Sequence, residues 1–120
     1  MTAPTIFIVE DDVDTREMLG RFLEREGFVV RTAANGQQAL EQLTGGLQVC
    51  VILLDLMMPV MDGWQFRREQ SRLESVADVP VIVVSAVARD RLAEIDADAV
   101  IPKPVDLDEL LKQITAHCAR

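Results

Sequence analysis

At 120 residues the chain has the length of one domain, and its content of 49% hydrophobic and 27% charged residues is that of an ordinary globular protein. The net charge of −8 argues against nucleic acid or an anionic membrane surface as a direct partner, because both repel a negative surface. The N-terminus lacks the basic segment and long apolar stretch of a signal peptide, and no apolar run is long enough to span a membrane. We therefore expect a cytoplasmic protein.

The cysteine content is low. Cys50 lies within an apolar run and Cys118 near the end of a predicted helix. Two cysteines do not make a disulfide framework, so the sequence favours two reduced thiols.

Short apolar runs alternate with helix-like segments along the whole chain. Strands are predicted at residues 5–9, 28–32, 49–54, 81–84 and 99–101, and helices at about 14–26, 36–44, 63–73, 89–95 and 106–117. In the first helix Met18 and Phe22 form the predicted apolar face, with Leu19 and Leu23 as further candidates. The alternation predicts an α/β fold, a doubly wound parallel five-stranded sheet in a single (βα)5 domain over residues 1–120.

Polar residues fall at the ends of the predicted strands. Glu10 and Asp11 follow the first strand, Asp55 the third, Ser85 the fourth and Lys103 the fifth. In a parallel α/β sheet with right-handed crossovers these ends meet at one edge, where ligands bind. The sequence therefore predicts one site with three carboxylates, a hydroxyl and an ammonium group.

Such a carboxylate cluster requires a cation, because like charges held close together disfavour one another's ionisation. Carboxylate oxygens suit Mg²⁺ or Mn²⁺, whereas zinc would require positioned Cys or His ligands. Phosphoryl transfer depends on this kind of charge stabilisation. The pattern favours Asp55 as a nucleophile, with Ser85 and Lys103 holding phosphoryl oxygens.

Four segments resemble the signature motifs of response-regulator receiver domains of two-component signal transduction. They are Ile-Val-Glu-Asp-Asp (8–12), Leu-Leu-Asp-Leu-Met-Met-Pro-Val-Met-Asp-Gly (53–63), Val-Ser-Ala (84–86) and Pro-Lys-Pro (102–104). The resemblance covers essentially the whole chain. It implies a flavodoxin-like fold with strand order 2-1-3-4-5 and a phosphorylated signalling switch that is not a turnover enzyme. The implied partners are a sensor histidine kinase or phosphotransfer protein and a downstream protein target.

The resemblance also implies a metal site. Asp11 matches the direct metal ligand, and Glu10 matches the acidic neighbour that acts through water. Asp55 matches the phosphorylated aspartate, which also binds the metal. Met57 occupies the position whose backbone carbonyl completes the coordination.

Three further positions match groups that respond to the phosphoryl group. Ser85 matches the switch hydroxyl, and Lys103 matches the lysine that pairs with the phosphoryl group. Pro104 matches the proline whose preceding peptide bond is usually cis in this family.

Other polar residues have structural explanations. Asp12 or Asp14 would cap the first helix, and Asp62, before Gly63, is expected to be a turn or cap residue. His117 lies near the C-terminus and is expected on the surface.

Two other functions compete with a phosphorylated switch. A haloacid-dehalogenase-type phosphatase also uses an aspartate nucleophile with Mg²⁺, but it places a second aspartate where this chain has Met57. Met57, Met58 and Met61 are interpreted as loop packing, since thioether sulfur is a poor ligand for Mg²⁺. A degenerate receiver that only binds partners is disfavoured by the full set of site residues.

Two features depart from the family pattern. The segment between Ser85 and Lys103 is about one helical turn shorter than usual, so the fourth helix should be truncated. Val100 stands where the family usually has an aromatic switch residue. We therefore expect a protein that signals through the segment after Ser85 and does not form the family's common dimer. The terminal helix ends cleanly at Arg120, which favours a stand-alone receiver.

Overall fold

The computed structural model describes residues 3–86, 89–92 and 95–118. Five parallel strands form one sheet in the order β2-β1-β3-β4-β5, as predicted. The strands are β1 (Thr5–Val9), β2 (Val29–Ala33), β3 (Val51–Leu54), β4 (Val81–Ser85) and β5 (Ala99–Pro102). The helices are α1 (Val13–Arg25), α2 (Gly36–Thr44), α3 (Gly63–Ser71), α4 (Arg89–Leu92) and α5 (Leu107–His117).

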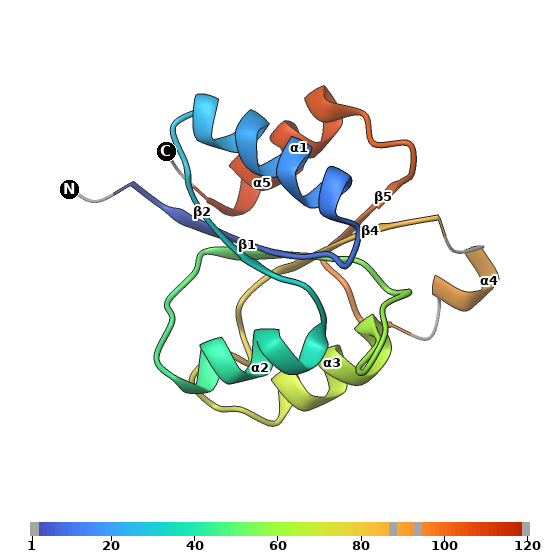
Figure 1. The fold of residues 1–120 in the computed structure, drawn as a ribbon. Coiled ribbons are helices and arrows are strands. Elements are labelled where there is room, and N and C mark those ends of the chain that lie inside the picture. Colours follow the sequence, from blue (N-terminus) through green and yellow to red (C-terminus); the bar gives the residue numbers. More distant parts are fainter. Residues whose placement is uncertain (1–2, 87–88, 93–94, 119–120) are drawn as a thin grey trace.

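Helices cover both faces of the sheet. Figure 1 shows α1 and α5 on one face and α2 and α3 on the other, while α4 lies off the edge near β4 and β5. Strands β3 and β4 are buried at every position, because they lie inside the sheet and between the helix layers. In the described part of the chain, no helix is long and apolar enough to cross a membrane.

Helix starts follow local sequence signals. Asp12, Asn35, Asp62 and Asp106 each accept a hydrogen bond from the backbone N–H three residues later, at 2.9–3.1 Å. These bonds satisfy N–H groups that have no partner within the helix. The predicted capping roles of Asp12 and Asp62 are therefore confirmed.

The predicted apolar face of α1 is partly wrong. Leu19 and Leu23 are almost completely buried, whereas Met18 is 41% exposed and Phe22 is only partly buried. The apolar residues form two adjacent pairs, Met18–Leu19 and Phe22–Leu23, so two neighbouring faces of the helix are apolar at helical spacing. The face with Leu19 and Leu23 is the one that packs on the sheet. The sequence alone did not distinguish between these two faces.

The described part of the fourth helix, α4, spans four residues. Residues 87, 88, 93 and 94, to which the predicted truncation also applies, lie outside the described chain. Helix α3 contacts this segment. The guanidinium carbon of Arg91 lies 4.4 Å from the ring centroid of Trp64, and Trp64 Nε1 donates to the Arg91 carbonyl at 3.4 Å. Val100 on β5 is 40% exposed.

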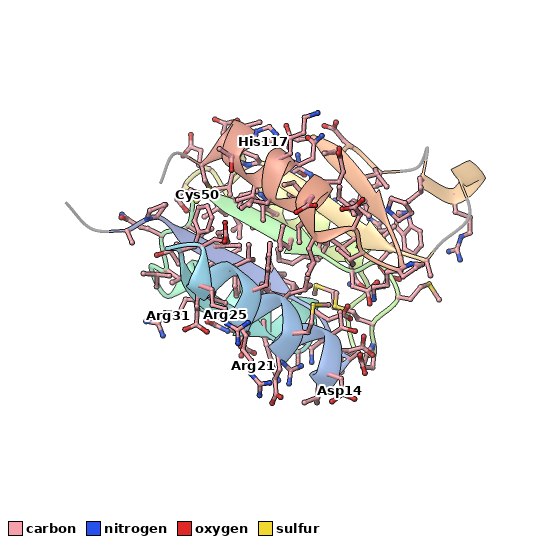
Figure 2. All side chains as sticks on the ribbon, turned by 90° about the horizontal axis from the view of Figure 1, so that it is seen from above. Asp14, Arg21, Arg25, Arg31, Cys50 and His117 are labelled. Carbon is pink, nitrogen blue, oxygen red and sulfur yellow. A yellow bond between two sulfur atoms is a disulfide. The ribbon has the colours of Figure 1, made fainter. Side chains whose placement is uncertain are left out.

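The cysteine prediction is wrong. Cys50 and Cys118 form a disulfide, with their Cα atoms 5.7 Å apart. Cys50 precedes β3 and Cys118 follows α5, and Figure 2 places Cys50 near the end of α5 that carries His117. Counting cysteines could not reveal this pair, because 68 residues separate them and only the fold brings them together.

Helix α3 begins in close contact with the end of β3. Gly63 donates its backbone N–H to the Leu56 carbonyl at 2.9 Å. A Cβ atom at this position would lie 2.6 Å from the Asp55 carbonyl oxygen and 2.7 Å from Leu56 Cα. Only glycine allows the helix to approach the backbone of Asp55 so closely.

We predict that Gly63→Ala lowers the free energy of unfolding by about 1–3 kcal/mol, because the backbone on both sides must move apart. Gly20→Ala is the matched control: its Cβ would lie 3.7 Å from Val30 Cγ1, an ordinary contact. Alanine within a helix should stabilise that variant by about 0.5–1 kcal/mol. Urea denaturation measures both, and equal stability of the two variants would contradict the close approach at Gly63.

We predict that reducing the disulfide lowers the free energy of unfolding by roughly 2–4 kcal/mol, because a long closed loop is released in the unfolded chain. Denaturation of the wild type should shift to lower urea on addition of a thiol reductant. Cys50→Ala should unfold at the lower midpoint with or without reductant. A wild-type midpoint that is indifferent to reductant would show that the bond does not form in solution.

Candidate functional site

The register of the sheet brings the predicted site residues to one edge. The Asp55 N–H donates to the Val9 carbonyl at 3.0 Å, which places the residue after β3 beside the end of β1. The Lys103 N–H donates to the Ser85 carbonyl at 3.1 Å, which aligns the ends of β4 and β5. All four strands run parallel, so their carboxyl ends form a single rim.

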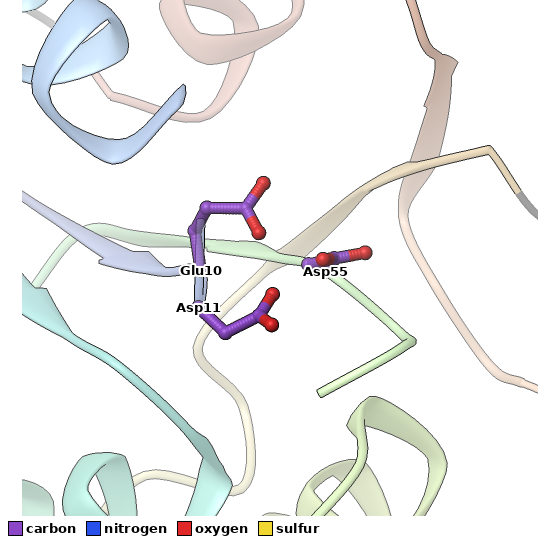
Figure 3. Close-up of side chains that lie close together, drawn as sticks. All are labelled: Glu10, Asp11 and Asp55. Atoms are coloured by element: carbon purple, nitrogen blue, oxygen red, sulfur yellow. The ribbon is translucent and has the colours of Figure 1, made fainter. Parts of the chain in front are cut away.

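Three carboxylates point into a common space on this rim, as Figure 3 shows. One carboxylate oxygen from each of Glu10, Asp11 and Asp55 lies within 4.8 Å of the others. Glu10 is 3% exposed and Asp55 is 6% exposed, whereas Asp11 is open to solvent. The cluster is thus buried on one side and accessible through Asp11.

Lys103 supplies positive charge to the cluster. Its Nζ lies 2.7 Å from Glu10 Oε1 and 3.5 Å from Asp55 Oδ2. The lysine side chain is 25% exposed, so it reaches the two buried carboxylates from the solvent side. One ammonium among three carboxylates leaves an excess of negative charge.

Burial, together with the neighbouring charges, shifts the pKa values of three of these groups. Burial, followed by the hydrogen bond with Asp55, raises the pKa of Glu10 even though Lys103 opposes the shift. Burial and the neighbouring Glu10 carboxylate raise the pKa of Asp11. Burial disfavours the charged form of Lys103, but the bond to Glu10 and the charge of Asp55 prevail and raise its pKa.

The donor set fits a hard divalent cation. Carboxylate oxygens are ligands that Mg²⁺ prefers, and the exposed side of the cluster leaves room for the waters that Mg²⁺ retains. The Met57 side chain is 56% exposed, and its N–H donates to Asp55 Oδ1 at 3.4 Å. Glu10, Asp11 and Asp55 could therefore hold the cation.

Three further residues named from the sequence are Ser85, Pro104 and His117. Ser85 is 3% exposed at the end of β4 and pairs in register with Pro102. The Lys103–Pro104 peptide bond is cis, as the family resemblance implied. His117 is exposed on α5, as expected.

The methionine prediction is partly wrong. Met58 and Met61 are buried and pack in the cluster beneath α2 and α3, but Met57 projects to solvent.

Sequence reasoning missed two residues that shape the site. Gly63 brings α3 against the backbone of Asp55, and Arg16 of α1 donates to the carbonyl of Glu10 at 2.9 Å. A glycine after Asp62 had suggested only a turn. An arginine in the first turn of a predicted helix carried no signal that could have identified its backbone acceptor.

Comparison with known proteins gives the same assignment. The family model described as "Response regulator receiver domain" matches residues 6–115. The transcriptional regulatory protein CpxR homolog of Haemophilus influenzae is 37% identical over 96% of this chain and 50% of its own length. The chain spans about half the length of this and other curated relatives.

Solved structures agree with the fold. A putative response regulator from Chloroflexus aurantiacus superposes with a TM-score of 0.90 at 27% identity, covering 99% of this chain and 100% of that one. Response regulator protein TrrA from Thermotoga maritima, solved in complex with Mg²⁺ and BeF, gives 0.83 at 29% identity, with 94% and 97% covered. These matches agree with the order of the motifs and strands and with the carboxylates on the rim. The chain belongs to the response-regulator receiver domain family.

Proposed function

We propose that the chain accepts a phosphoryl group on Asp55 in a Mg²⁺-dependent reaction and thereby changes its affinity for a downstream protein. The observation that carries this proposal is the setting of Asp55. Its carboxylate is buried, with Lys103 Nζ at 3.5 Å and the carboxylates of Glu10 and Asp11 within 4.8 Å. A nucleophile, a cationic group and metal ligands thus share one rim.

In the proposed reaction an Asp55 oxygen attacks the phosphorus of a phosphohistidine. The new bond is the acyl-phosphate P–O bond, and the P–N bond of the donor breaks. The electron pair of that bond goes to the imidazole nitrogen, which takes up a proton from solvent. Lys103 balances the negative charge on the phosphoryl oxygens, and the Ser85 hydroxyl, at the adjacent strand end, donates to one of them.

When bound, Mg²⁺ would neutralise phosphoryl oxygens and carboxylates together. Asp11 and Asp55 would be its direct ligands, the Met57 carbonyl a third, and Glu10 a ligand through water. The residues themselves arrange the rest: burial limits the access of water to Asp55, and Lys103 stays beside the attacking carboxylate.

The competing functions have less support. An aspartyl phosphatase of the haloacid-dehalogenase type requires an acid two positions after its nucleophile, and the thioether of Met57 cannot donate a proton. A degenerate receiver would not require Asp11, Asp55, Ser85 and Lys103 together on one rim.

The proposed partners are a sensor histidine kinase or a phosphotransfer protein as donor and a protein as target, in the cytoplasm. The net charge of −8 disfavours direct contact of this domain with nucleic acid. A relative named as a transcriptional regulatory protein is about twice as long as this chain. Its name therefore does not assign a DNA target to the domain itself.

We predict that Asp55 is the only acceptor. Incubation with a small phosphodonor and Mg²⁺ should add one hydroxylamine-sensitive phosphoryl group to the wild type and none to Asp55→Asn, as measured by intact-protein mass spectrometry. Asp62→Asn is the control, because asparagine caps a helix as well as aspartate does. Labelling of Asp55→Asn at the wild-type level would refute the assignment.

We predict that Mg²⁺ stabilises the folded protein, because it binds the assembled carboxylates and not the unfolded chain. The gain should reach about 2.7 kcal/mol at a hundredfold excess over Kd. Asp11→Asn should lose most of this gain, whereas Asp12→Asn should keep it, since Asp12 serves as the cap of α1. Thermal melts without MgCl₂ and over a series of increasing MgCl₂ concentrations measure the response. A wild-type melt that Mg²⁺ does not shift would contradict the metal site.

A further inference from the structure

The side chain of Arg16 contacts the backbone of the loop that carries Glu10 and Asp11, two of the three carboxylates. Arg16 Nη1 donates to the Glu10 carbonyl oxygen at 2.9 Å and lies 3.5 Å from the Asp11 carbonyl oxygen. Arg16 is half-buried in the first turns of α1, and its side chain folds back over the loop. Both acceptors are backbone carbonyls and not carboxylates of the cluster.

These contacts fix the orientation of two successive peptide planes. The Asp11 carbonyl and the Asp12 N–H belong to one planar unit and point in opposite directions. Arg16 lies near the oxygen of this unit, and the Asp12 N–H at its other end donates to Glu10 Oε2 at 3.3 Å. The Glu10 carboxylate is thus aimed by a peptide group whose orientation Arg16 restrains.

The Glu10 carbonyl is the stronger anchor. Its peptide unit includes the N–H of Asp11, so the 2.9 Å bond from Arg16 fixes the direction in which the Asp11 side chain leaves the backbone. Without this restraint, mutual repulsion would favour conformations in which the carboxylates of Glu10 and Asp11 move apart. The arginine opposes that movement before any cation is present.

We propose that Arg16 is a positioning residue of the metal site, which preorganises Glu10 and Asp11 by clamping their backbone carbonyls. This inference rests on the proposed Mg²⁺-dependent function. The positioning role and simple electrostatics predict opposite effects of removing Arg16 on the affinity for Mg²⁺. Removing the positive charge of Arg16 would by itself tighten Mg²⁺ binding, because it relieves Coulomb repulsion between the guanidinium and the cation. Loss of the clamp should instead weaken Mg²⁺ binding.

The test is titration of the metal-free protein with MgCl₂ by calorimetry, without a phosphodonor. We expect Arg16→Gln to raise the Mg²⁺ dissociation constant about tenfold, the lower end of the range for groups that orient metal ligands. Both contacts come from Nη1, and the Nζ of Arg16→Lys would be one bond closer to the backbone than that atom. This variant keeps the charge but reaches less far, so its affinity should lie between the other two. Arg21→Gln is the matched control, because it removes the same charge from the same helix (Figure 2 labels Arg21 on α1). The Arg21 side chain is 72% exposed and pairs with Glu17.

The outcomes separate this inference from the proposed function. If the wild type and Arg16→Gln bind Mg²⁺ equally, or the variant binds more tightly, the positioning role is refuted while the metal site stands. If the wild type itself does not bind Mg²⁺, both fail. A role limited to fastening α1 would lower the melting temperature of the metal-free variant and leave its dissociation constant unchanged, which also refutes positioning. Should Arg16→Gln not fold, equal affinities of Arg16→Lys and the wild type would refute it.

Discussion

The structure depends on holding three carboxylates together at the edge of a sheet whose interior is apolar. Glu10 and Asp55 are buried, and Lys103 is the cationic side chain that contacts both. Burying such charges costs several kcal/mol each unless they are paired. The parallel sheet makes this arrangement possible, because the interior strands β3 and β4 carry no polar residue until they reach the rim.

The pairing of Lys103 also links the two sides of the site. The shorter of its two contacts is with Glu10, at the end of β1, and the longer is with Asp55, at the end of β3. A cation bound at Glu10 would therefore compete with the Lys103 ammonium group for that carboxylate.

The sequence was most informative where one physical requirement dominated. Continuous apolar runs predicted β3 and β4, alternation with helices predicted the sheet, and parallel topology then predicted that Glu10, Asp55 and Lys103 would meet. Several observed helix and strand boundaries differ from the predicted ones by one or two residues. One reason is that capping residues such as Asp12 decide where a helix starts. Side-chain contacts with backbone, such as that of Arg16, follow no residue pattern and required the structure.

The disulfide was missed for a related reason, since its partners meet only in the folded chain. Its position has a topological consequence. The bond closes residues 50–118 into a covalent ring that contains β3, β4 and β5, and because β2 and β1 lie together at the other side of the sheet, this ring coincides with one contiguous half of the fold. Asp55, Ser85 and Lys103 belong to the ring, whereas Glu10 and Asp11 belong to the open half. If the open half detached, Asp55, the proposed acceptor, would stay linked to Ser85 and Lys103 within the ring. It would lose Glu10 and Asp11, so the affinity for a metal ion would report how firmly the two halves are docked.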